Sequence, residues 1–289
     1  MLENCKKYWI AILALVLGAT AGILIYVDFS MSGNMLTVAM LNIGQGDSIL
    51  IRTASGHEVL FDGGPRGAIL RELPKVIPFY DHHIDMIVIT NPDADHIGGF
   101  LDVLKAYKVD KVLEPGTFND TKTYKDLERE IVNRKIEKFL ARRGMRIDLG
   151  SGAYIDILFP DRDVSTWTSN DGSIVAQLHY GKTSVMLTGD ATQKTEKIIL
   201  AENSAQSLRS DILKVGHHGS RTSTSSEFVK ALAPTYALIS VGKDNKYGHP
   251  HKETLDTLTL ANIKTLRTDL LGTIIMKTDG QNEVFSYEK

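Results

Sequence analysis

Apolar residues along the chain form short runs separated by glycine-containing turns, which is the pattern of β-strands. Three such runs open the body of the chain, at residues 36–43, 48–52 and 58–61. Residues 86–90 (Met-Ile-Val-Ile-Thr) are apolar except for the last one, as expected of a strand buried on both faces. We therefore predict that the body of the chain begins with a sheet.

Segments with helical spacing follow these strands. Residues 98–107 have this spacing, and residues 123–143 predict a longer amphipathic helix that ends at Gly144. The second half of the chain repeats the order from sheet to helix, although no sequence repeat is evident. Its predicted strands are residues 154–159, 174–180, 184–188, 212–215, 237–241, 273–277 and 283–287. Its predicted helices are residues 193–202, 226–232 and 252–260.

Two sheets covered by outer helices predict an α/β fold, a four-layer αββα sandwich that forms one domain over residues 35–289. Hydrophobic residues make up 43% and charged residues 24% of the chain, which favours a globular core over disorder. The net charge of −2 excludes a basic field that would hold nucleic acid by charge alone, but it permits a local patch. Since Cys5 is the only cysteine, we expect neither a disulfide framework nor a thiolate metal cluster.

The first 29 residues differ from the rest of the chain. Lys6 and Lys7 precede residues 8–27, which contain no charged side chain. About 20 apolar residues span a bilayer as a helix, and flanking lysines favour the cytoplasmic side. We therefore predict a single transmembrane helix, a signal anchor, within residues 1–29. A linker at residues 30–34 would then lead to the body of the chain on the extracytoplasmic face of the cell membrane.

A cleavable signal peptide is the alternative to an anchor. Ala19, Thr20 and Ala21 resemble a small-residue cleavage site, and cleavage there would release a secreted protein. The apolar run continues from Gly22 to Val27, past that site, which favours the uncleaved anchor.

Candidate chemistry is concentrated in four polar segments that follow apolar runs. The first segment has Asp93, Asp95 and His96 within four positions. Carboxylate and imidazole ligands suit hard or borderline divalent metals. The alternative is a helix N-terminus at which the two aspartates cap free backbone N–H groups. The second segment, residues 187–191, contains Asp190, and a single aspartate after an apolar strand is more often a helix cap.

The third and fourth segments contain pairs of histidines. His217 and His218 are adjacent, and in an extended segment adjacent side chains point to opposite faces. One of them is therefore expected to bind metal and the other to support it or to contact substrate, but the spacing does not decide between them. The fourth segment, residues 243–251, places two lysines beside His249 and His251. Five of the nine histidines lie in the four segments, which scattered surface histidines would not do.

Taken together, these segments resemble the metallo-β-lactamase superfamily, whose signature is His-x-His-x-Asp-His. The resemblance covers about residues 35–278 and is closest to the hydrolase domain of ComEC-type DNA-internalisation competence proteins. The matching motifs are Asn42-Ile43-Gly44-Gln45-Gly46-Asp47-Ser48, Phe61-Asp62-Gly63-Gly64, residues 92–99, residues 187–190, residues 216–223 and residues 241–251.

The resemblance implies a role for each matching residue. Asp95, His96 and Asp190 would be the catalytic residues, and Asp95 could also orient a water molecule or take up its proton. Asp95 and His96 would hold one metal ion, with Asp190 shared or bridging. The set of metal ligands implied in this way is Asp93, Asp95, His96, Asp190, His218 and His249, with either of the last two completing the first site.

The chain departs from the family pattern at three expected histidines. Asn91 stands where the first histidine of the signature would be, and Asn170 stands near a further one, while Asp93 replaces the second. One metal site is therefore rich in ligands and the other is poor. The resemblance implies one or two divalent ions, zinc or manganese, with the oxygen-rich ligand set favouring manganese or magnesium over zinc.

The implied reaction is hydrolysis of a phosphodiester by a nuclease whose substrate is extracytoplasmic DNA, in DNA uptake, with an unidentified channel partner. Cations at Lys214, Arg221, Lys243 and Lys246 could neutralise a phosphate. The residues expected to contact substrate are His217, Ser220, Arg221, Thr222, Lys243, Tyr247 and His251. One alternative is an ester, lactone or β-lactam hydrolase, because fold does not fix function. The other is a non-catalytic domain that binds DNA or a protein partner and has a degenerate metal site.

Two further motifs are interpreted as structural. Gly44-Gln45-Gly46-Asp47 lacks the Lys-Ser/Thr ending of a phosphate-binding loop, so we expect a tight connection between strands. Asp62 follows a strand, and we expect it to fix a turn or to orient a histidine of the site.

Overall fold

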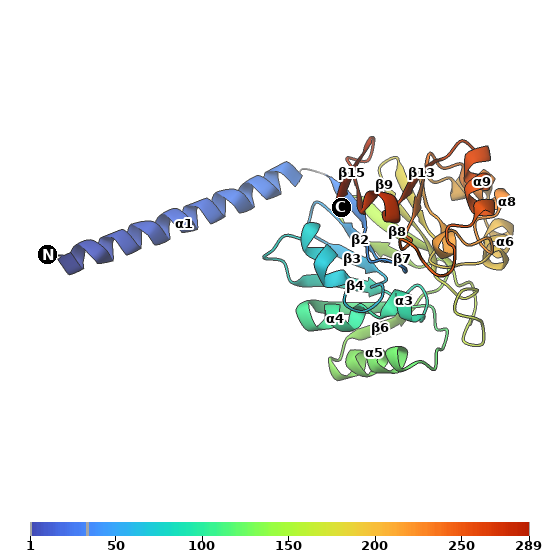
Figure 1. Ribbon diagram of the computed structural model, residues 1–289, viewed down its shortest axis with the longest axis horizontal. Helices are drawn as coiled ribbons and strands as arrows, with labels where there is room; N and C mark the ends of the chain where they lie inside the picture. The colour runs from blue at the N-terminus through green and yellow to red at the C-terminus, as the bar shows by residue number, and fades with distance from the viewer. Residues whose placement is uncertain (1, 33–34, 289) are drawn as a thin grey trace.

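Two β-sheets lie face to face at the centre of the fold, and helices cover the outer face of each (Figure 1). The computed structural model describes residues 2–32 and 35–288, and within the N-terminal helix it describes the side chains of residues 7–20, 22 and 23.

The first sheet has eight strands in the order β15-β14-β1-β2-β3-β4-β5-β6. Pairing is parallel from β3 to β6 and antiparallel elsewhere. The strands are β1 (Leu36–Met40), β2 (Ile49–Arg52), β3 (Glu58–Phe61), β4 (His83–Val88), β5 (Lys108–Glu114), β6 (Glu137–Leu140), β14 (Thr273–Thr278) and β15 (Glu283–Glu288).

The second sheet has seven strands in the order β13-β12-β11-β10-β9-β8-β7. Pairing is antiparallel from β7 to β10 and parallel from β10 to β13. The strands are β7 (Arg146–Asp148), β8 (Ala153–Phe159), β9 (Val175–Tyr180), β10 (Thr183–Leu187), β11 (Ile212–Lys214), β12 (Tyr236–Ile239) and β13 (Lys264–Arg267). Both sheets are therefore mixed.

Helices form the two outer layers. On the first sheet they are α2 (Ile69–Glu72), α3 (Ala94–Ile97), α4 (Phe100–Ala106) and α5 (Lys122–Asn133). On the second they are α6 (Gln193–Glu202), α8 (Ser226–Leu232) and α9 (Lys252–Leu260). Short helical turns complete the described chain: η1 (Leu73–Lys75), α7 (Ala205–Leu208), η2 (Gly216–Gly219) and α10 (Thr268–Leu271).

Three apolar clusters separate the four layers, and single strands contribute to two of them. In β1, Val38 and Met40 belong to the cluster between the sheets, whereas Ala39 faces the outer cluster that also contains Phe100 of α4. A third cluster packs the second sheet against its helices, with Phe228 of α8 among its buried residues. This alternation with a period of two explains why the central strands are apolar at nearly every position.

The helix predicted over residues 123–143 is wrong after residue 133. Helix α5 ends at Asn133, and residues 137–140 form the strand β6. The apolar spacing from Leu127 to Ile131 would place the next apolar residue at 134 or 135, where the chain has Arg134 and Lys135. Lys135 also has a φ of 55°, which ends the helical conformation.

The N-terminal segment forms α1 (Leu2–Ser32), on which Tyr8, Trp9 and Leu15 are exposed. Over the part of the chain that the structure describes, no helix combines the length and the apolar content that crossing a bilayer requires. The anchor within residues 1–29 stays a prediction. Helix α1 includes the first three residues of the predicted linker at 30–34, while Gly33 and Asn34 lie outside the described residues.

Glu58, at the start of β3, makes the stability of the fold depend on pH. Burial and the charge of Asp81 raise its pKa to about 8, although Arg52 contacts the carboxyl at 3.0 Å and opposes the shift. The folded state therefore keeps a proton that the unfolded chain loses above the ordinary glutamate pKa of about 4.3. The resulting stabilisation is present in full at low pH and is lost as the pH rises through 8.

We therefore expect the free energy of unfolding to fall by up to a few kcal/mol between pH 5 and pH 9, and Glu58→Gln to flatten this dependence. Urea unfolding of both proteins across this range would measure the effect, with the exposed Glu137→Gln as the control. An unchanged slope in Glu58→Gln would contradict the assignment.

Candidate metal centre

The polar segments meet at one edge of the sandwich because the parallel strands end there. Strands β3 and β4 of the first sheet lead into Asp62 and His96, and strands β10 and β11 of the second lead into Asp190 and His218. Parallel strands direct their carboxyl-terminal loops to the same edge of a sheet, where open α/β folds place ligands. Four segments that are far apart in sequence therefore form one site between the two sheets.

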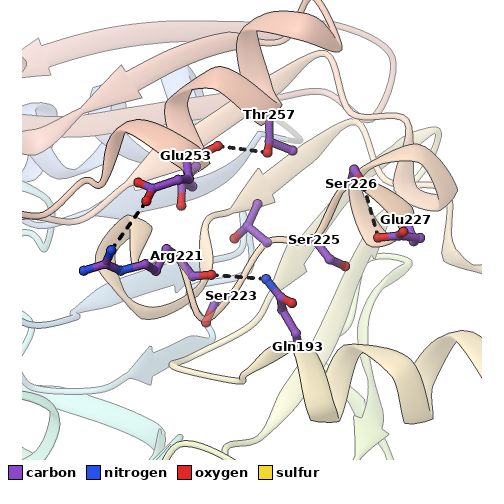
Figure 2. Close-up of a pocket in the computed structure, with 10 residues that line it drawn as sticks. Gln193, Arg221, Ser223, Ser225, Ser226, Glu227, Glu253 and Thr257 are labelled. Carbon is purple, nitrogen blue, oxygen red and sulfur yellow. Dashed lines mark hydrogen bonds and ion pairs between the residues drawn. The ribbon is translucent and has the colours of Figure 1, made fainter.

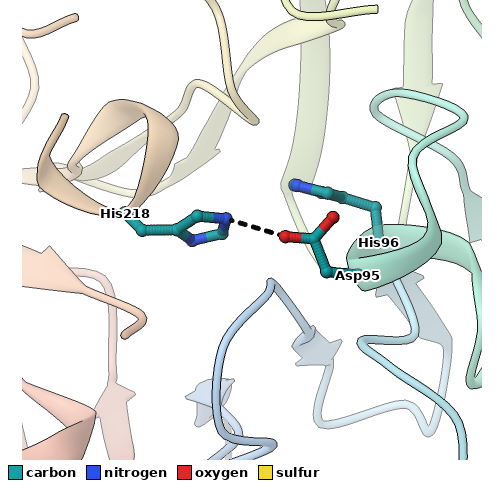
Figure 3. Close-up of side chains that lie close together, drawn as sticks. All are labelled: Asp95, His96 and His218. Carbon is teal, nitrogen blue, oxygen red and sulfur yellow. Dashed lines mark ion pairs between the residues drawn. The ribbon is translucent and has the colours of Figure 1, made fainter. Parts of the chain in front are cut away.

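Asp95, His96 and His218 point toward one another at the centre of the site (Figure 3). Their ligand atoms all lie within 4.8 Å, and His218 Nε2 is 3.4 Å from Asp95 Oδ2. Asp190 completes the group, because its Oδ2 is 3.1 Å from His96 Nε2 and 3.6 Å from His218 Nε2. All are buried apart from Asp95, whose side chain is 36% exposed and faces the opening.

The histidine pair lies in a turn and not in an extended segment as expected. Within η2, His217 and His218 both have a left-handed backbone conformation, with φ values of 49° and 54°. Both rings therefore reach the site, and His217 Nε2 lies 3.8 Å from Asp190 Oδ2. Gly219 allows this turn, since its φ is +85° and a Cβ there would meet Pro250 at 2.5 Å.

His249 comes from the loop after β12 and lies beside the other histidines. Its ring centroid is 5.5 Å from that of His217 and 6.2 Å from that of His218. Burial, and then the neighbouring imidazoles, lower the pKa of His249 to about 4. The ring is therefore neutral at physiological pH and has a free lone pair, as a metal ligand needs.

Asp62 orients His96, as expected from its position after a strand. Its Oδ2 accepts a hydrogen bond from His96 Nδ1 at 2.8 Å and another from Thr90 Oγ1, while Oδ1 accepts from the Thr90 backbone N–H. A proton on Nδ1 leaves the lone pair of Nε2 directed into the site.

Asp47, in the connection between β1 and β2, is a residue of the site that the sequence analysis missed. Gly46 brings this connection against the backbone of Asp95, where a Cβ would meet the Asp95 carbonyl at 2.1 Å. Asp47 is then buried beside Lys214 and lies 3.4 Å from His218 Nδ1. Burial alone would raise its pKa, but Lys214 and His218 lower it below the ordinary value. The sequence around Asp47 indicated only a turn.

Lys214 lies beneath the site and not in a groove open to DNA. Its side chain is 1% exposed and pairs with Asp47. A phosphate therefore cannot reach it, and our prediction that Lys214 neutralises a phosphate is wrong. The other three predicted cations are exposed, with the Arg221 guanidinium 3.5 Å from Glu253 and the Lys246 ammonium 5.1 Å from the ring centroid of Tyr247.

The buried polar atoms without a hydrogen-bond partner among the described residues include four at this centre: His96 Nε2, His218 Nε2, Asp190 Oδ1 and His249 Nδ1. Such atoms cost about 1–3 kcal/mol each and are rare in folded proteins. Nitrogen and carboxylate donors that converge in this way fit a divalent ion, which Asp95, His96, Asp190 and His218 would hold, with His249 beside them.

The electrostatics of the centre also favour a cation. Burial alone would lower the pKa of His218, but the charges of Asp190 and Asp47 raise it to about 10. The pKa of His96 is raised in the same way by Asp190 and Asp62, against the effect of burial. The carboxylates therefore create a negative field that binds protons when no other cation neutralises it.

Asp93 and Asn91 are tied into the loop before α3. Asp93 Oδ1 accepts from Asn119 Nδ2 at 2.9 Å, and the Asp93 backbone N–H donates to Asn91 Oδ1 at 2.9 Å. Asp93, which we expected to bind metal, belongs to none of the groups of converging ligand atoms among the described residues.

The predicted substrate-binding residues come from two loops, 217–222 and 243–251, which we call the rim, and all of them except the buried Ser220 are at least partly exposed. Thr222 Oγ1 is 3.0 Å from Ser220 Oγ and 3.3 Å from His217 Nδ1. His251 Nδ1 accepts from the Arg221 backbone N–H at 3.1 Å, and its ring centroid is 4.8 Å from that of His249. Tyr247 stacks on His249 and is 53% exposed, and Lys243 is exposed nearby in the chain.

A polar pocket of about 240 Å³ lies behind this rim, between α6, α8 and α9 (Figure 2). Arg221 lines it together with Gln193, whose Nε2 donates to the Arg221 carbonyl oxygen at 3.1 Å. The pocket also contains Glu227 and Glu253, so it does not offer the uniformly positive surface that a phosphate requires.

Residues 41–243 match the sequence pattern of the Metallo-beta-lactamase superfamily, and the chain belongs to this superfamily. Among curated relatives, it is 32% identical over 272 residues to "ComE operon protein 3" of Bacillus subtilis, which covers 86% of this chain and 34% of the relative. It is 33% identical over 227 residues to "Recombination protein 2" of Haemophilus influenzae, which covers 76% of this chain and 26% of the relative. The chain thus spans about a third or less of these relatives' length.

The fold agrees with that of solved metallo-hydrolases. Igni18, described as a novel metallo hydrolase from Ignicoccus hospitalis, superposes with a TM-score of 0.52 at 15% identity, over 88% of this chain and all of that one. This likeness establishes the fold. A further relative, "Competence protein ComA" of Neisseria gonorrhoeae, is 29% identical over 255 residues, which cover 88% of this chain and 34% of the relative.

Proposed function

We propose that this chain is a metal-dependent phosphodiesterase, a nuclease that acts on DNA outside the cytoplasm. The observation that carries the proposal is the group of converging, buried ligand atoms on Asp190, His96 and His218, which lies beside the partly exposed Asp95, and the loop of His249 adds the exposed Lys243 and Lys246. The similarity to a relative named as a competence protein supports DNA as the substrate and DNA uptake as the process.

The residues in and around the centre would have different roles in hydrolysis. A divalent ion, zinc or manganese, would supply a nucleophilic water near neutral pH and neutralise charge on the bond under attack. The imidazole of His218, which lies beside the carboxylate, and the charge of His96 hold the pKa of Asp95 low despite burial, so its carboxylate is available to orient that water or to accept its proton. His217, Ser220 and Thr222 stand at the rim, where they can donate hydrogen bonds to a phosphate.

Two other functions make different predictions for the same site. An ester, lactone or β-lactam hydrolase would cleave small substrates and would be indifferent to the rim lysines. A non-catalytic binding domain would bind DNA without retaining a metal ion. The exposed cations and the tyrosine at the rim favour a polyanion with bases that can stack.

A nuclease assay on the full chain tests the proposal. The protein would be stripped of metal, refilled with manganese, zinc or magnesium, and incubated with single- and double-stranded DNA beside an Asp190→Ala control. Metal-restored cleavage that the control lacks would establish the activity and identify the ion. No cleavage with any ion, together with no retained metal, would refute it.

We also propose that α1 holds the domain at the extracytoplasmic face of the cell membrane. Support comes from Lys6 and Lys7 ahead of an uncharged run and from the exposed apolar side chains of Tyr8, Trp9 and Leu15. Cell fractionation would place the full chain in the membrane and accessible to protease added outside. Recovery in the medium would indicate cleavage instead, and recovery in the cytoplasm would refute both placements.

Reversing the charge of the rim lysines should weaken DNA binding. We expect Lys243→Glu with Lys246→Glu to raise the KM for DNA about tenfold at low salt. The slope of log affinity against log salt should fall by roughly one for each phosphate that the lysines no longer neutralise. The matched control is Lys105→Glu with Lys108→Glu, since these lysines are also exposed but lie away from the site. Equal KM values for the two double variants would contradict a DNA path over the rim.

A further inference from the structure

Lys214, the last residue of β11, lies under the candidate metal centre where a substrate cannot touch it. Its ammonium pairs with Asp47, donates to the Gly189 carbonyl oxygen at 2.6 Å and lies 3.8 Å from Asp190 Oδ1. A buried ammonium is stable only when it is paired and hydrogen-bonded, and these partners meet that condition. The lysine is therefore a fixed positive charge within the centre.

The two oxygens of Asp190 face different cations. Oδ2 is directed toward His96 and His218, whereas Oδ1 is directed toward the ammonium of Lys214. Asp190 would have to share its charge between two ions in a two-metal centre. Here the lysine already neutralises the side of the carboxylate that a second ion would need.

We propose that the ammonium of Lys214 takes the electrostatic place of a second divalent ion, so that the centre holds one ion tightly. This inference rests on the proposed function only in requiring that the centre binds a divalent ion.

The poor side of the centre agrees with this role. Asn91 and Asn170 are neutral, and the carboxylate of Asp93 is hydrogen-bonded to Asn119. A second ion beside Asp190 would share that carboxylate with the first ion and would meet the positive charge of Lys214, 3.8 Å from Asp190 Oδ1. Repulsion between like charges in a buried site is strong because little water screens it.

Counting bound ions tests the inference without measuring catalysis. The full chain would be saturated with Mn²⁺, freed of excess ion and measured for manganese per chain by mass spectrometry and electron paramagnetic resonance. We expect wild type and Lys214→Arg to hold one ion with the spectrum of an isolated Mn²⁺. We expect Lys214→Met to hold two ions whose spins are coupled, the second bound at least tenfold more tightly than in wild type.

A matched control is Lys138→Met, which removes another paired lysine. Lys138 contacts Glu114 and Glu128 and none of the residues of the centre, so this variant should keep one ion. If Lys214→Met fails to fold, as judged by circular dichroism, Asp47→Asn with Lys214→Met leaves no unpaired buried charge and should hold two ions.

The outcomes separate this inference from the proposed function. One ion in the folded variant that lacks Lys214, or two tight ions in wild type, would overturn the role of the lysine and leave the metal-dependent activity standing. A wild-type chain that retains no divalent ion would overturn both.

Discussion

Asp190→Ala should abolish metal retention and lower the rate of DNA cleavage on the order of 10³-fold. The residue is 3% exposed, and its Oδ2 lies between His96 Nε2 and His218 Nε2. Its removal takes away the charge that joins ligands from both sheets, and with it several kcal/mol of transition-state stabilisation.

Metal content by mass spectrometry and the cleavage rate under single-turnover conditions would measure this effect. Asp211→Ala is a suitable control, because Asp211 also makes partly buried hydrogen bonds, to Ser184, but lies at the opposite end of β11 from the site. Both variants should lose stability, and only Asp190→Ala should lose metal. If Asp190→Ala retained one ion and cleaved DNA at the wild-type rate, the assignment of the centre would be wrong.

Asp62→Asn should weaken metal binding 10- to 100-fold although it hardly changes the shape of the side chain. The carboxylate now accepts from His96 Nδ1 at 2.8 Å, so the proton of the imidazole stays on that nitrogen. An amide can keep the bond from the Thr90 backbone, but its NH₂ group would face Nδ1 and would favour the tautomer with the proton on Nε2. That proton would occupy the lone pair that the metal needs.

Competition with a chelator of known affinity would measure the loss, and thermal unfolding of the metal-free proteins would show whether the fold is kept. Asp62→Ala removes the same hydrogen bond without imposing the wrong tautomer, so it should bind metal more tightly than Asp62→Asn but lose more stability. The reverse order of metal affinities would rule out tautomer control.

Sequence alone predicted the elements whose local signals agree with their tertiary surroundings. Helices α6, α8 and α9 begin and end as predicted, and α8 starts at a serine cap, Ser225, whose side chain accepts from the Phe228 backbone N–H. The error at residues 134–143 has a tertiary cause: β6 is a strand because β5 offers it a parallel partner along Lys111 to Glu114. An isolated apolar pattern carries no information about that partner.

The sequence predicted most of the residues that form the site but not which of its charged side chains are buried. Polar residues after apolar strands indicated Asp95, His96, Asp190 and the histidine pair, and the structure brings all of them together. The pairing of Asp47 with Lys214 joins residues on two different sheets, and nothing near either residue distinguishes a buried ion pair from a turn aspartate and a surface lysine. Only the packing of the two halves determines which charges are covered.

His96 follows a strand of the first sheet, whereas Asp190 and His218 follow strands of the second. An ion bound at the centre would therefore link the two halves of the domain. Binding to the folded state alone adds about 2.7 kcal/mol of stability when the free ion is at a hundred times its Kd. The supply of the ion would then set the lifetime of the protein against proteases. When the ion is scarce, the metal-free protein would be less stable and would be degraded more quickly.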